Sequence, residues 1–165
     1  MKPAQIRKAE RNEAQILTEL SFASKRHWNY PEKYFKILHS ELTITSDYLS
    51  NHNVFVYEFE DCIFAYYSLR TLAEDQLAGK VVIPAGTWLE HMFVHPEKIG
   101  KTIGAQLFNH MINVAGNERI RQIQILADPH SRYFYEKMGC RYIKEFPSSI
   151  SGRTTPYLIF RLEED

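Results

Sequence analysis

The stretch HPEKIGKTIGAQLF, residues 95–108, decides how the rest of this sequence is interpreted. The apolar residues Met92–Val94 come directly before it, and apolar residues at helical spacing continue after it to Ala115. A strand that passes through a short glycine-containing loop into a helix offers an anion both backbone amides and the positive end of the helix dipole. Lys98 and Lys101 add positive charge. The stretch therefore predicts a phosphate-binding turn between a strand and a helix.

The triplet Gly100-Lys101-Thr102 is also the end of the P-loop pattern of nucleoside triphosphate sites. That pattern needs an earlier glycine for the turn around the β-phosphate, and His95 stands at its position. An ordinary strand-to-helix turn without a ligand is the other alternative that this stretch alone leaves open. The sequence disfavours a P-loop and leaves the second alternative to be decided by other segments.

The composition fits one domain, residues 1–165, with 44% hydrophobic residues to build a core. Twenty basic and twenty acidic side chains give a formal net charge of zero, which argues against a general nucleic-acid binder. No apolar run approaches the roughly 18 residues of a membrane span, and the first residues lack the apolar core of a signal peptide, so we expect a cytoplasmic protein. The cysteines, Cys62 and Cys140, are expected to be free core thiols, and no metal-ligand spacing is present.

Hydrophobic periodicity and turn residues predict an α+β, or mixed α/β, domain. Strands are expected at residues 5–7, 53–59, 62–69, 87–94, 122–127, 141–145 and 157–162, and helices after Asn12, after Pro31, and at 103–115 and 131–138. Asn12 and Gln15 are predicted to form a capping box. Gly116-Asn117 and Gly139 are predicted to end two of the helices. The polar residues 70–80 are expected to form a loop.

A second segment, ADPHSRYFYEKMGC at residues 127–140, follows the strand expected at 122–127. Together with the opening stretch it resembles motifs A and B of the GNAT superfamily, the acyl-CoA-dependent N-acyltransferases. Its core, Phe134-Tyr135-Glu136-Lys137-Met138-Gly139, is similar to the Phe-Tyr-x-Lys-x-Gly of that family. The run Leu89-Glu90-His91 and the tail at 148–153, with Pro156, are similar to one group of small bacterial-type members. The element order of the whole chain fits the family as well.

The resemblance implies a central, mostly antiparallel sheet that is splayed at the cofactor site and flanked by about four helices. It also implies that the loop binds the pyrophosphate of acetyl-CoA, the co-substrate. The residues expected to bind this cofactor are Phe93, Val94, Ile99, Gly100, Lys101, Thr102, Ile103, Gly104, Asp128, Ser131 and Phe134. Four of them depart from the family pattern. The family has Arg or Gln at the position of Ile99, Gly at that of Thr102, Asn at that of Asp128 and Ala at that of Ser131. The Thr102 hydroxyl is a further candidate donor to a phosphate.

Acyl transfer from a thioester to an amine needs a neutral amine, a stabilised oxyanion and a proton for the departing thiolate. By resemblance Tyr135 is the expected general acid, and a backbone N–H near Phe93 or Val94, at a bulge in the strand, is expected to face the thioester carbonyl. Glu90 is the first candidate for the general base. His91 is the second candidate for the base, although strand alternation predicts that it points to the other face of the sheet. The third alternative is a reaction without a dedicated base.

The resemblance thus implies an enzyme that transfers an acetyl group from acetyl-CoA to a primary amine of a small molecule. A protein or peptide amine as the acceptor and a catalytically idle CoA-binding sensor are alternatives that the sequence leaves open. No nucleic-acid or membrane partner is expected, and a homodimer is left open. Candidate walls of the acceptor site, with core packing as the alternative for each, are Trp28, Tyr30, Tyr34, Tyr66 and Tyr67.

Overall fold

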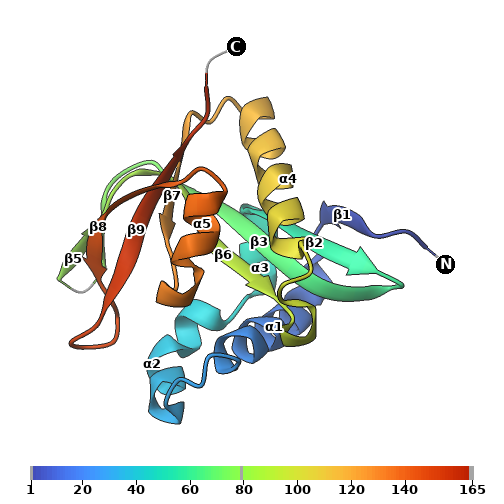
Figure 1. The fold of residues 1–165 in the computed structure, drawn as a ribbon, viewed down its shortest axis with the longest axis horizontal. Coiled ribbons are helices and arrows are strands. Elements are labelled where there is room, and N and C mark those ends of the chain that lie inside the picture. The colour runs from blue at the N-terminus through green and yellow to red at the C-terminus, as the bar shows by residue number, and fades with distance from the viewer. Residues whose placement is uncertain (1, 79, 164–165) are drawn as a thin grey trace. The chain divides into compact units, whose positions relative to one another are not determined.

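The computed structural model describes residues 2–78 and 80–163, which form an α+β fold (Figure 1). The strands are β1 Gln5–Lys8, β2 Asn53–Phe59, β3 Cys62–Leu72, β4 Gln76–Ala78, β5 Val81–Ile83, β6 Gly86–Val94, β7 Gln122–Leu126, β8 Arg141–Pro147 and β9 Thr154–Arg161. The helices are α1 Ala14–Arg26, α2 Glu32–Leu42, α3 Ser46–Asn51, α4 Ile103–Asn117 and α5 Arg132–Lys137. Three short 3-10 helices are η1 Arg11–Glu13, η2 Pro96–Lys98 and η3 Pro129–Ser131.

Seven strands are hydrogen-bonded in the order β1-β2-β3-β6-β7-β9-β8, and β4 and β5 form a separate hairpin. The pairs β1–β2, β7–β9 and β8–β9 are antiparallel, whereas β6 and β7 are parallel. The parallel pairing runs from Thr87 opposite Ile123 to Leu89 opposite Ile125, and Glu90 lies beyond the last of these pairs. The mostly antiparallel sheet is the one that the resemblance implied.

The described chain forms two compact units. Unit 1 contains the chain up to Ser68 together with His91–His110, and unit 2 contains Leu69–Glu90 and the chain from Met111 onward. That residues 1–165 behave as one domain stays a prediction.

Unit 1 is built around an apolar cluster between two helices and the strands beside them. Figure 1 shows β1 alongside β2, as their antiparallel pairing requires. The cluster combines a stripe of α1 with the inward residues of β2 and with α3, and its members are Leu17, Leu20, Ile44, Leu49, Val54, Val56 and Tyr66. Alternate residues of β2 and every third or fourth residue of α1 supply it, which is the periodicity that the sequence showed.

Unit 2 has a second apolar cluster, formed by Leu72, Trp88, Phe146 and Tyr157, on which the β5 residues Val81 and Ile83 pack. A buried amide is satisfied beside this cluster. Gln124 accepts a hydrogen bond from the Tyr157 hydroxyl at 2.6 Å and donates one to the backbone oxygen of Ala85 at 3.0 Å. The hairpin β4–β5 therefore belongs to the fold of unit 2, because its inward face covers the core.

The pairing of β3 with β6 shifts by one residue along the two strands. Thr71 faces Thr87, with their hydroxyl oxygens 3.0 Å apart. Ser68, three residues earlier in β3, contacts His91, which lies four residues later in β6. Between these contacts β6 has one residue more than β3, so it contains a β-bulge. Side chains do not alternate regularly between the two faces of a sheet across a bulge. Alternation therefore does not support the expectation that His91 points to the face opposite to Glu90.

The structure corrects several expectations about local elements. The capping box is formed by Glu10 and Glu13 at the start of η1, not by Asn12 and Gln15. The end of α4 at Asn117, by contrast, agrees with the stop expected at Gly116-Asn117, and φ at Arg119 is 58°. The segment expected to be a loop, residues 70–80, contains the end of β3 and strand β4, and helix α3 was not expected.

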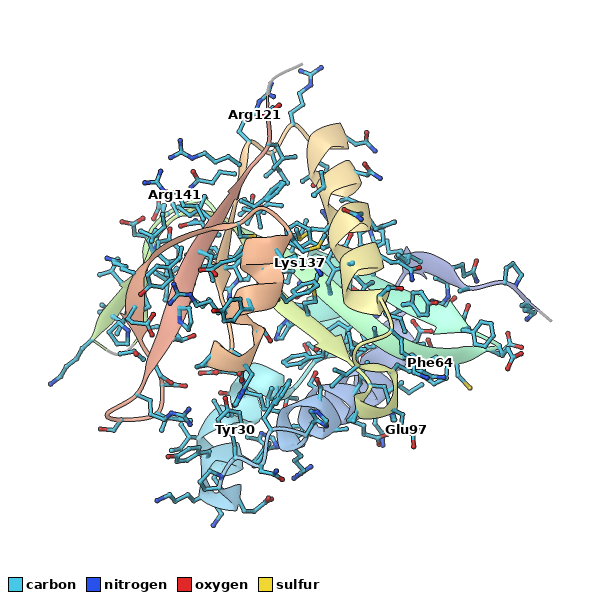
Figure 2. The ribbon with its side chains drawn as sticks, in the orientation of Figure 1. Tyr30, Phe64, Glu97, Arg121, Lys137 and Arg141 are labelled. Atoms are coloured by element: carbon cyan, nitrogen blue, oxygen red, sulfur yellow. The ribbon has the colours of Figure 1, made fainter. Side chains whose placement is uncertain are left out.

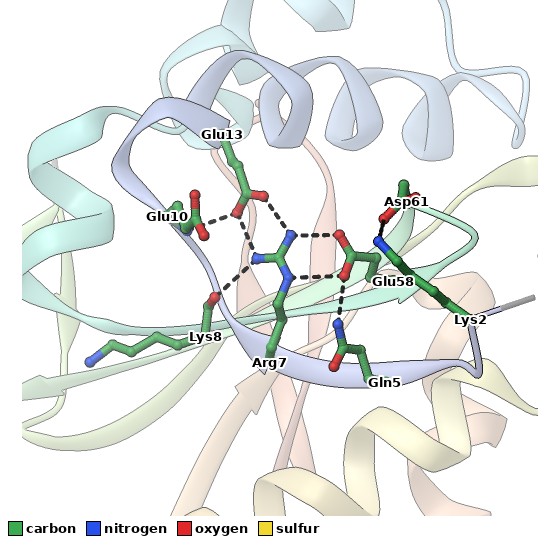
Figure 3. A network of polar contacts seen from close by, with 8 residues as sticks. All are labelled: Lys2, Gln5, Arg7, Lys8, Glu10, Glu13, Glu58 and Asp61. Carbon is green, nitrogen blue, oxygen red and sulfur yellow. Dashed lines mark hydrogen bonds and ion pairs between the residues drawn. The ribbon is translucent and has the colours of Figure 1, made fainter.

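Arg7 lies on β1 between two carboxylates, as Figure 3 shows. Its guanidinium contacts Glu13 at 2.7 Å and Glu58 at 2.8 Å, and Gln5 also donates to Glu58. The hydrogen bond from Arg7 is the main cause that lowers the pKa of Glu58 to about 2. The network ties the first strand to β2 and to the turn before α1.

Glu58→Gln should make acid unfolding less steep. The pKa of Glu58 is lowered from 4.5 to about 2, so its carboxylate stabilises the folded state above pH 4.5 and loses this effect as the pH falls toward 2. The variant should lose roughly 1–2 kcal/mol of unfolding free energy at pH 7, because charged hydrogen bonds contribute about 1.5–3 kcal/mol and solvent screens partly exposed pairs. Urea unfolding at a series of pH values measures both effects.

The matched control is Asp61→Asn, which removes the exposed ion pair between Asp61 and Lys2. This control should leave the acid slope almost unchanged. An equal slope in wild type and Glu58→Gln would contradict the role given to the Arg7 network.

Candidate active site

The loop after β6 has two residues in the left-handed region, Gly100 with φ of 79° and Thr102 with φ of 65°. The first conformation suits glycine, whereas the second is strained for a β-branched residue. Strain of this kind costs on the order of 1–3 kcal/mol and gathers at functional sites. Thr102 stands where the family pattern has glycine, so the structure keeps the backbone conformation of that pattern although the residue has changed.

Helix α4 starts with backbone amides that point away from any acceptor. Its first hydrogen bond joins the amide of Gln106 to the carbonyl of Thr102 at 3.0 Å, and the side chains of the same two residues are 3.2 Å apart. Within the part of the chain that the structure describes, the amides from Gly100 to Ala105 have no hydrogen-bond partner. A run of unpaired N–H groups at the positive end of a helix of 15 residues binds anions.

The two lysines of the loop are held differently. The Lys98 amine lies 4.7 Å from the centre of the Phe64 ring, a cation–π contact, whereas Lys101 is exposed. Figure 2 labels Phe64 and Glu97 close to the start of α4, where this loop runs. His95 opens the loop, and its amide donates to the carbonyl of Phe64 at 2.7 Å. The loop is therefore anchored to β3 at its first residue and leaves Lys101 available to an anion.

The second motif lies in unit 2 and begins with a polar turn. The Asp128 side chain accepts a hydrogen bond from the amide of His130 at 2.9 Å, and the Ser131 amide donates to the Asp128 carbonyl at 2.8 Å. This turn leads into α5, which carries Phe134 and Tyr135 with their rings 5.1 Å apart. Asp128 thus closes the turn as an N-cap, a task that the asparagine of the family pattern can also perform.

Tyr135 is buried, with 6% of its surface exposed. Burial raises the pKa of its phenol far above the ordinary value, and negative charge on Cys140 or Asp128 acts in the same direction. The phenol therefore stays protonated at every pH at which the protein works, as a proton donor must.

Glu90, the first candidate for the base, forms an ion pair with Arg70 of β3 at 3.0 Å. The same guanidinium donates to the side-chain oxygen of Gln76 in β4, also at 3.0 Å. The side chains of Arg70 and Glu90 are 33% and 29% exposed, so solvent and ligands reach both. No sequence pattern points to Arg70 or Gln76, because their proximity to Glu90 depends on strand register and on the β4–β5 hairpin.

His91, the second candidate for the base, has both ring nitrogens in hydrogen bonds. Its Nε2 lies 2.9 Å from the carbonyl oxygen of Glu41, so Nε2 carries the proton. Nδ1 then accepts from the Ser68 hydroxyl at 2.7 Å, and Tyr48 donates to Ser68 at 2.9 Å. Because the carbonyls of the last turn of α2 have no partner within the helix, His91 ties that turn to β6. A ring engaged in this way favours a structural role over proton abstraction.

The candidate walls of the acceptor site separate into two groups. Tyr66 and Tyr67 are fully buried, and their hydroxyls pair with Ser21 at 2.5 Å and His110 at 2.8 Å, so both serve the core. Trp28, Tyr30 and Tyr34, in and after the connection between α1 and α2, are half-buried. Figure 2 labels Tyr30 in this connection. The three half-buried rings remain candidates for contact with an acceptor.

Among residues 2–78 and 80–163, no group of three or more His, Cys, Asp or Glu side chains could hold a metal ion. No helix in that part of the chain is long and apolar enough to cross a membrane.

The loop, the bulge and the second motif can be compared with known proteins. A family model described as "Acetyltransferase (GNAT) domain" matches residues 48–147, which is more than half of the chain. The chain belongs to the GNAT acetyltransferase family. The match includes β6, the loop, α4 and α5, so it covers both segments on which the resemblance was based. No curated protein matches this GNAT chain.

Solved structures share the GNAT fold along almost the whole chain. The PaiA N-acetyltransferase of Thermoplasma acidophilum, in complex with coenzyme A, is 14% identical with a TM-score of 0.74 and covers 98% of this chain and 100% of its own. A GCN5-related N-acetyltransferase of Rhodopseudomonas palustris is 16% identical with a TM-score of 0.73, and covers 98% of each chain. YncA of Salmonella typhimurium, a putative acetyltransferase solved with acetyl-CoA, is 17% identical with a TM-score of 0.69 and covers 99% and 96%.

The structure places the predicted GNAT site residues on two segments. Phe93 and Val94 end β6, and the residues from Ile99 to Gly104 form the loop and the first turn of α4, all in unit 1. Asp128, Ser131, Phe134 and Tyr135 lie together on η3 and α5, and Glu90 lies on β6, all in unit 2. Their roles toward the cofactor and the acceptor stay predictions.

His91→Gln should be tolerated better than His91→Asn. The amide nitrogen of Gln can reach the place of Nε2 and donate to Glu41, whereas Asn can replace only the contact with Ser68. We expect Gln to melt about 3 °C higher than Asn, the shift that about 1 kcal/mol gives in a domain of this size, and to retain acetyl transfer with an unchanged low-pH limb. Thermal melts and rate profiles of both variants test this. Equal melting temperatures with turnover lost in both would identify His91 as the base.

Proposed function

We propose that this protein transfers an acetyl group from acetyl-CoA to a primary amine of a small molecule. The observation that carries the proposal is the run of unpaired amides from Gly100 to Ala105 at the start of α4. It fits the pyrophosphate of coenzyme A because oriented backbone donors and the helix dipole act on the same anion. The coenzyme A and acetyl-CoA of the PaiA and YncA structures support the choice of cofactor.

The reaction forms one bond and breaks one. The lone pair of the neutral amine attacks the thioester carbonyl, the carbonyl oxygen takes up negative charge, and the C–S bond then breaks. The amine nitrogen loses a proton and the sulfur gains one, so the products are an N-acetyl amine and the free thiol of coenzyme A. Phe93 and Val94 lie beyond the last pair of β6 with β7, and we infer that a backbone N–H of one of them stabilises the oxyanion.

Glu90 and Tyr135 are the residues to which we give proton transfers. Glu90 receives the amine proton, directly or through water, and its partial exposure gives it access to solvent. Tyr135 donates a hydrogen bond or a proton to the leaving sulfur. Because burial raises the pKa of the Tyr135 phenol, the hydroxyl keeps its proton and acts on the sulfur first as a hydrogen-bond donor. The proposal places the reaction in the cytoplasm, where the exposed thiol of Cys62 stays reduced.

Acetyl-CoA should raise the melting temperature, because it binds only the folded state, whereas ATP with magnesium should have little effect. Gly104→Glu should reduce the acetyl-CoA effect strongly, since it puts a negative side chain at the start of α4. Thr102→Gly, the matched control in the same loop, should bind acetyl-CoA at least as well, because glycine adopts the left-handed conformation without strain. Stabilisation by ATP and not by acetyl-CoA would reject the proposal, and free-thiol release with a panel of amines tests the transfer itself.

Tyr135→Phe should lower kcat with little change in the KM for acetyl-CoA. The variant keeps the ring that packs against Phe134 and removes only the hydroxyl. General acid catalysis contributes about 10²–10⁴-fold, and we expect the lower end because a thiolate is already a fair leaving group. The pH profile should keep its shape, since the phenol does not titrate in the working range.

Steady-state kinetics with one accepted amine measure the effect, and Tyr133→Phe, which alters an exposed tyrosine of the same helix, is the control. A wild-type kcat in Tyr135→Phe, with the chemical step rate-limiting, would leave Tyr135 a packing residue.

A further inference from the structure

Arg70, Glu90 and Gln76 form a polar cluster in unit 2 that the proposed reaction uses only in part. Arg70 and Glu90 lie diagonally across β3 and β6, since Thr71 is opposite Thr87. Long side chains reach each other over that distance. Their 3.0 Å ion pair is thus placed at the last residue of β6 before the register shift.

The Arg70 guanidinium is fixed in position but not saturated. It has five N–H donors, of which one is used by Glu90 and one by the side-chain oxygen of Gln76. The other three have no partner in the described part of the chain. The two contacts are made by different nitrogens and so fix the plane of the Arg70 guanidinium. Its remaining N–H groups can bind a carboxylate, which a guanidinium contacts through two parallel hydrogen bonds.

The cluster also presents both signs of charge side by side. Only about a third of each side chain is exposed, so water screens these charges less than it screens charges on an open surface. An amino acid carries the complementary pair, an amine and a carboxylate separated by one carbon atom. Its carboxylate fits Arg70 and its amine fits Glu90, which is the group that receives the proton in the proposed reaction.

We propose that the acceptor is an amino acid, or another small amine with a carboxylate next to it, and that Arg70 determines this specificity. This inference rests on the proposed acetyl transfer. The bound ammonium first gives one proton to water. The neutral nitrogen then attacks the acetyl carbonyl and gives its second proton to Glu90, the C–S bond breaks, and the sulfur takes up one proton, so the products are an N-acetyl amino acid and the thiol of coenzyme A. Arg70 keeps its charge throughout and only binds the carboxylate.

The test compares acceptors that differ only in the carboxylate. For wild type and variants, kcat/KM is measured by free-thiol release with a set of amino acids, their carboxamides and their decarboxylated amines. Wild type should prefer the free acid. Arg70→Gln should reduce the ratio of acid to carboxamide about 10–100-fold, because a charged hydrogen-bond partner of the carboxylate is lost. Arg70→Lys keeps the charge without the fork and should retain part of the preference.

Arg11→Gln is the matched control, since it removes an arginine from an exposed ion pair, with Asp47. It should leave both the ratio and the rate as in wild type. Turnover of amines without a preference for the free acid, or equal losses for acid and carboxamide in Arg70→Gln, would overturn the inference and leave the acetyl transfer standing. Absence of turnover with every amine would overturn the proposed function, and the inference with it.

Discussion

The one-residue shift between β3 and β6 is the constraint on which the functional part of this structure depends. Without it, Thr71 opposite Thr87 would continue regularly to Ser68 opposite Glu90, and the ladder would have no irregularity. The extra residue instead brings His91 to Ser68. Glu90 is left at the bulge beside Arg70, and a strand that would otherwise be fully paired can offer side chains and amides to a ligand.

The same shift explains why two neighbouring polar residues have different tasks. Glu90 keeps about a third of its side chain in contact with solvent and shares its charge with Arg70. His91 is buried and has both nitrogens engaged, so that it fastens the end of α2. A partly exposed carboxylate and a buried imidazole with two hydrogen bonds are therefore neighbours in the chain with different surroundings.

The sequence predicted the parts of this fold that depend on local pattern. Strand β2 was predicted correctly, since alternation specifies it, and the loop before α4 was found from its glycines and the helix that follows. The β4–β5 hairpin was missed because Gln76–Ala78 is exposed throughout and gives no alternating pattern. The end of α4 at Asn117 agrees with the stop expected at Gly116-Asn117.

The residues of the candidate site also differ in whether the sequence could predict them. Tyr135 and the phosphate loop carry a recognisable order of residues, so the sequence alone suggested them. Arg70, Gln76 and Ser68 do not, because their contacts arise from strand register and from the β4–β5 hairpin, which the sequence pattern does not reveal. Cys62 was expected in the core and is exposed, since it is the first residue of β3 after a tight turn.

Burial of Cys140 has a consequence for the acetyl transfer that we propose. The amide of Cys140 bonds to the carbonyl of Tyr135, so this thiol lies shortly after the helix that carries Tyr135. Burial raises the pKa of Cys140 to about 12, and at pH 7 only ~1 thiol in 10⁵ is then ionised. A thiolate is the form of cysteine that would capture an acetyl group by thioester exchange. Burial therefore protects the Cys140 thiol from acylation.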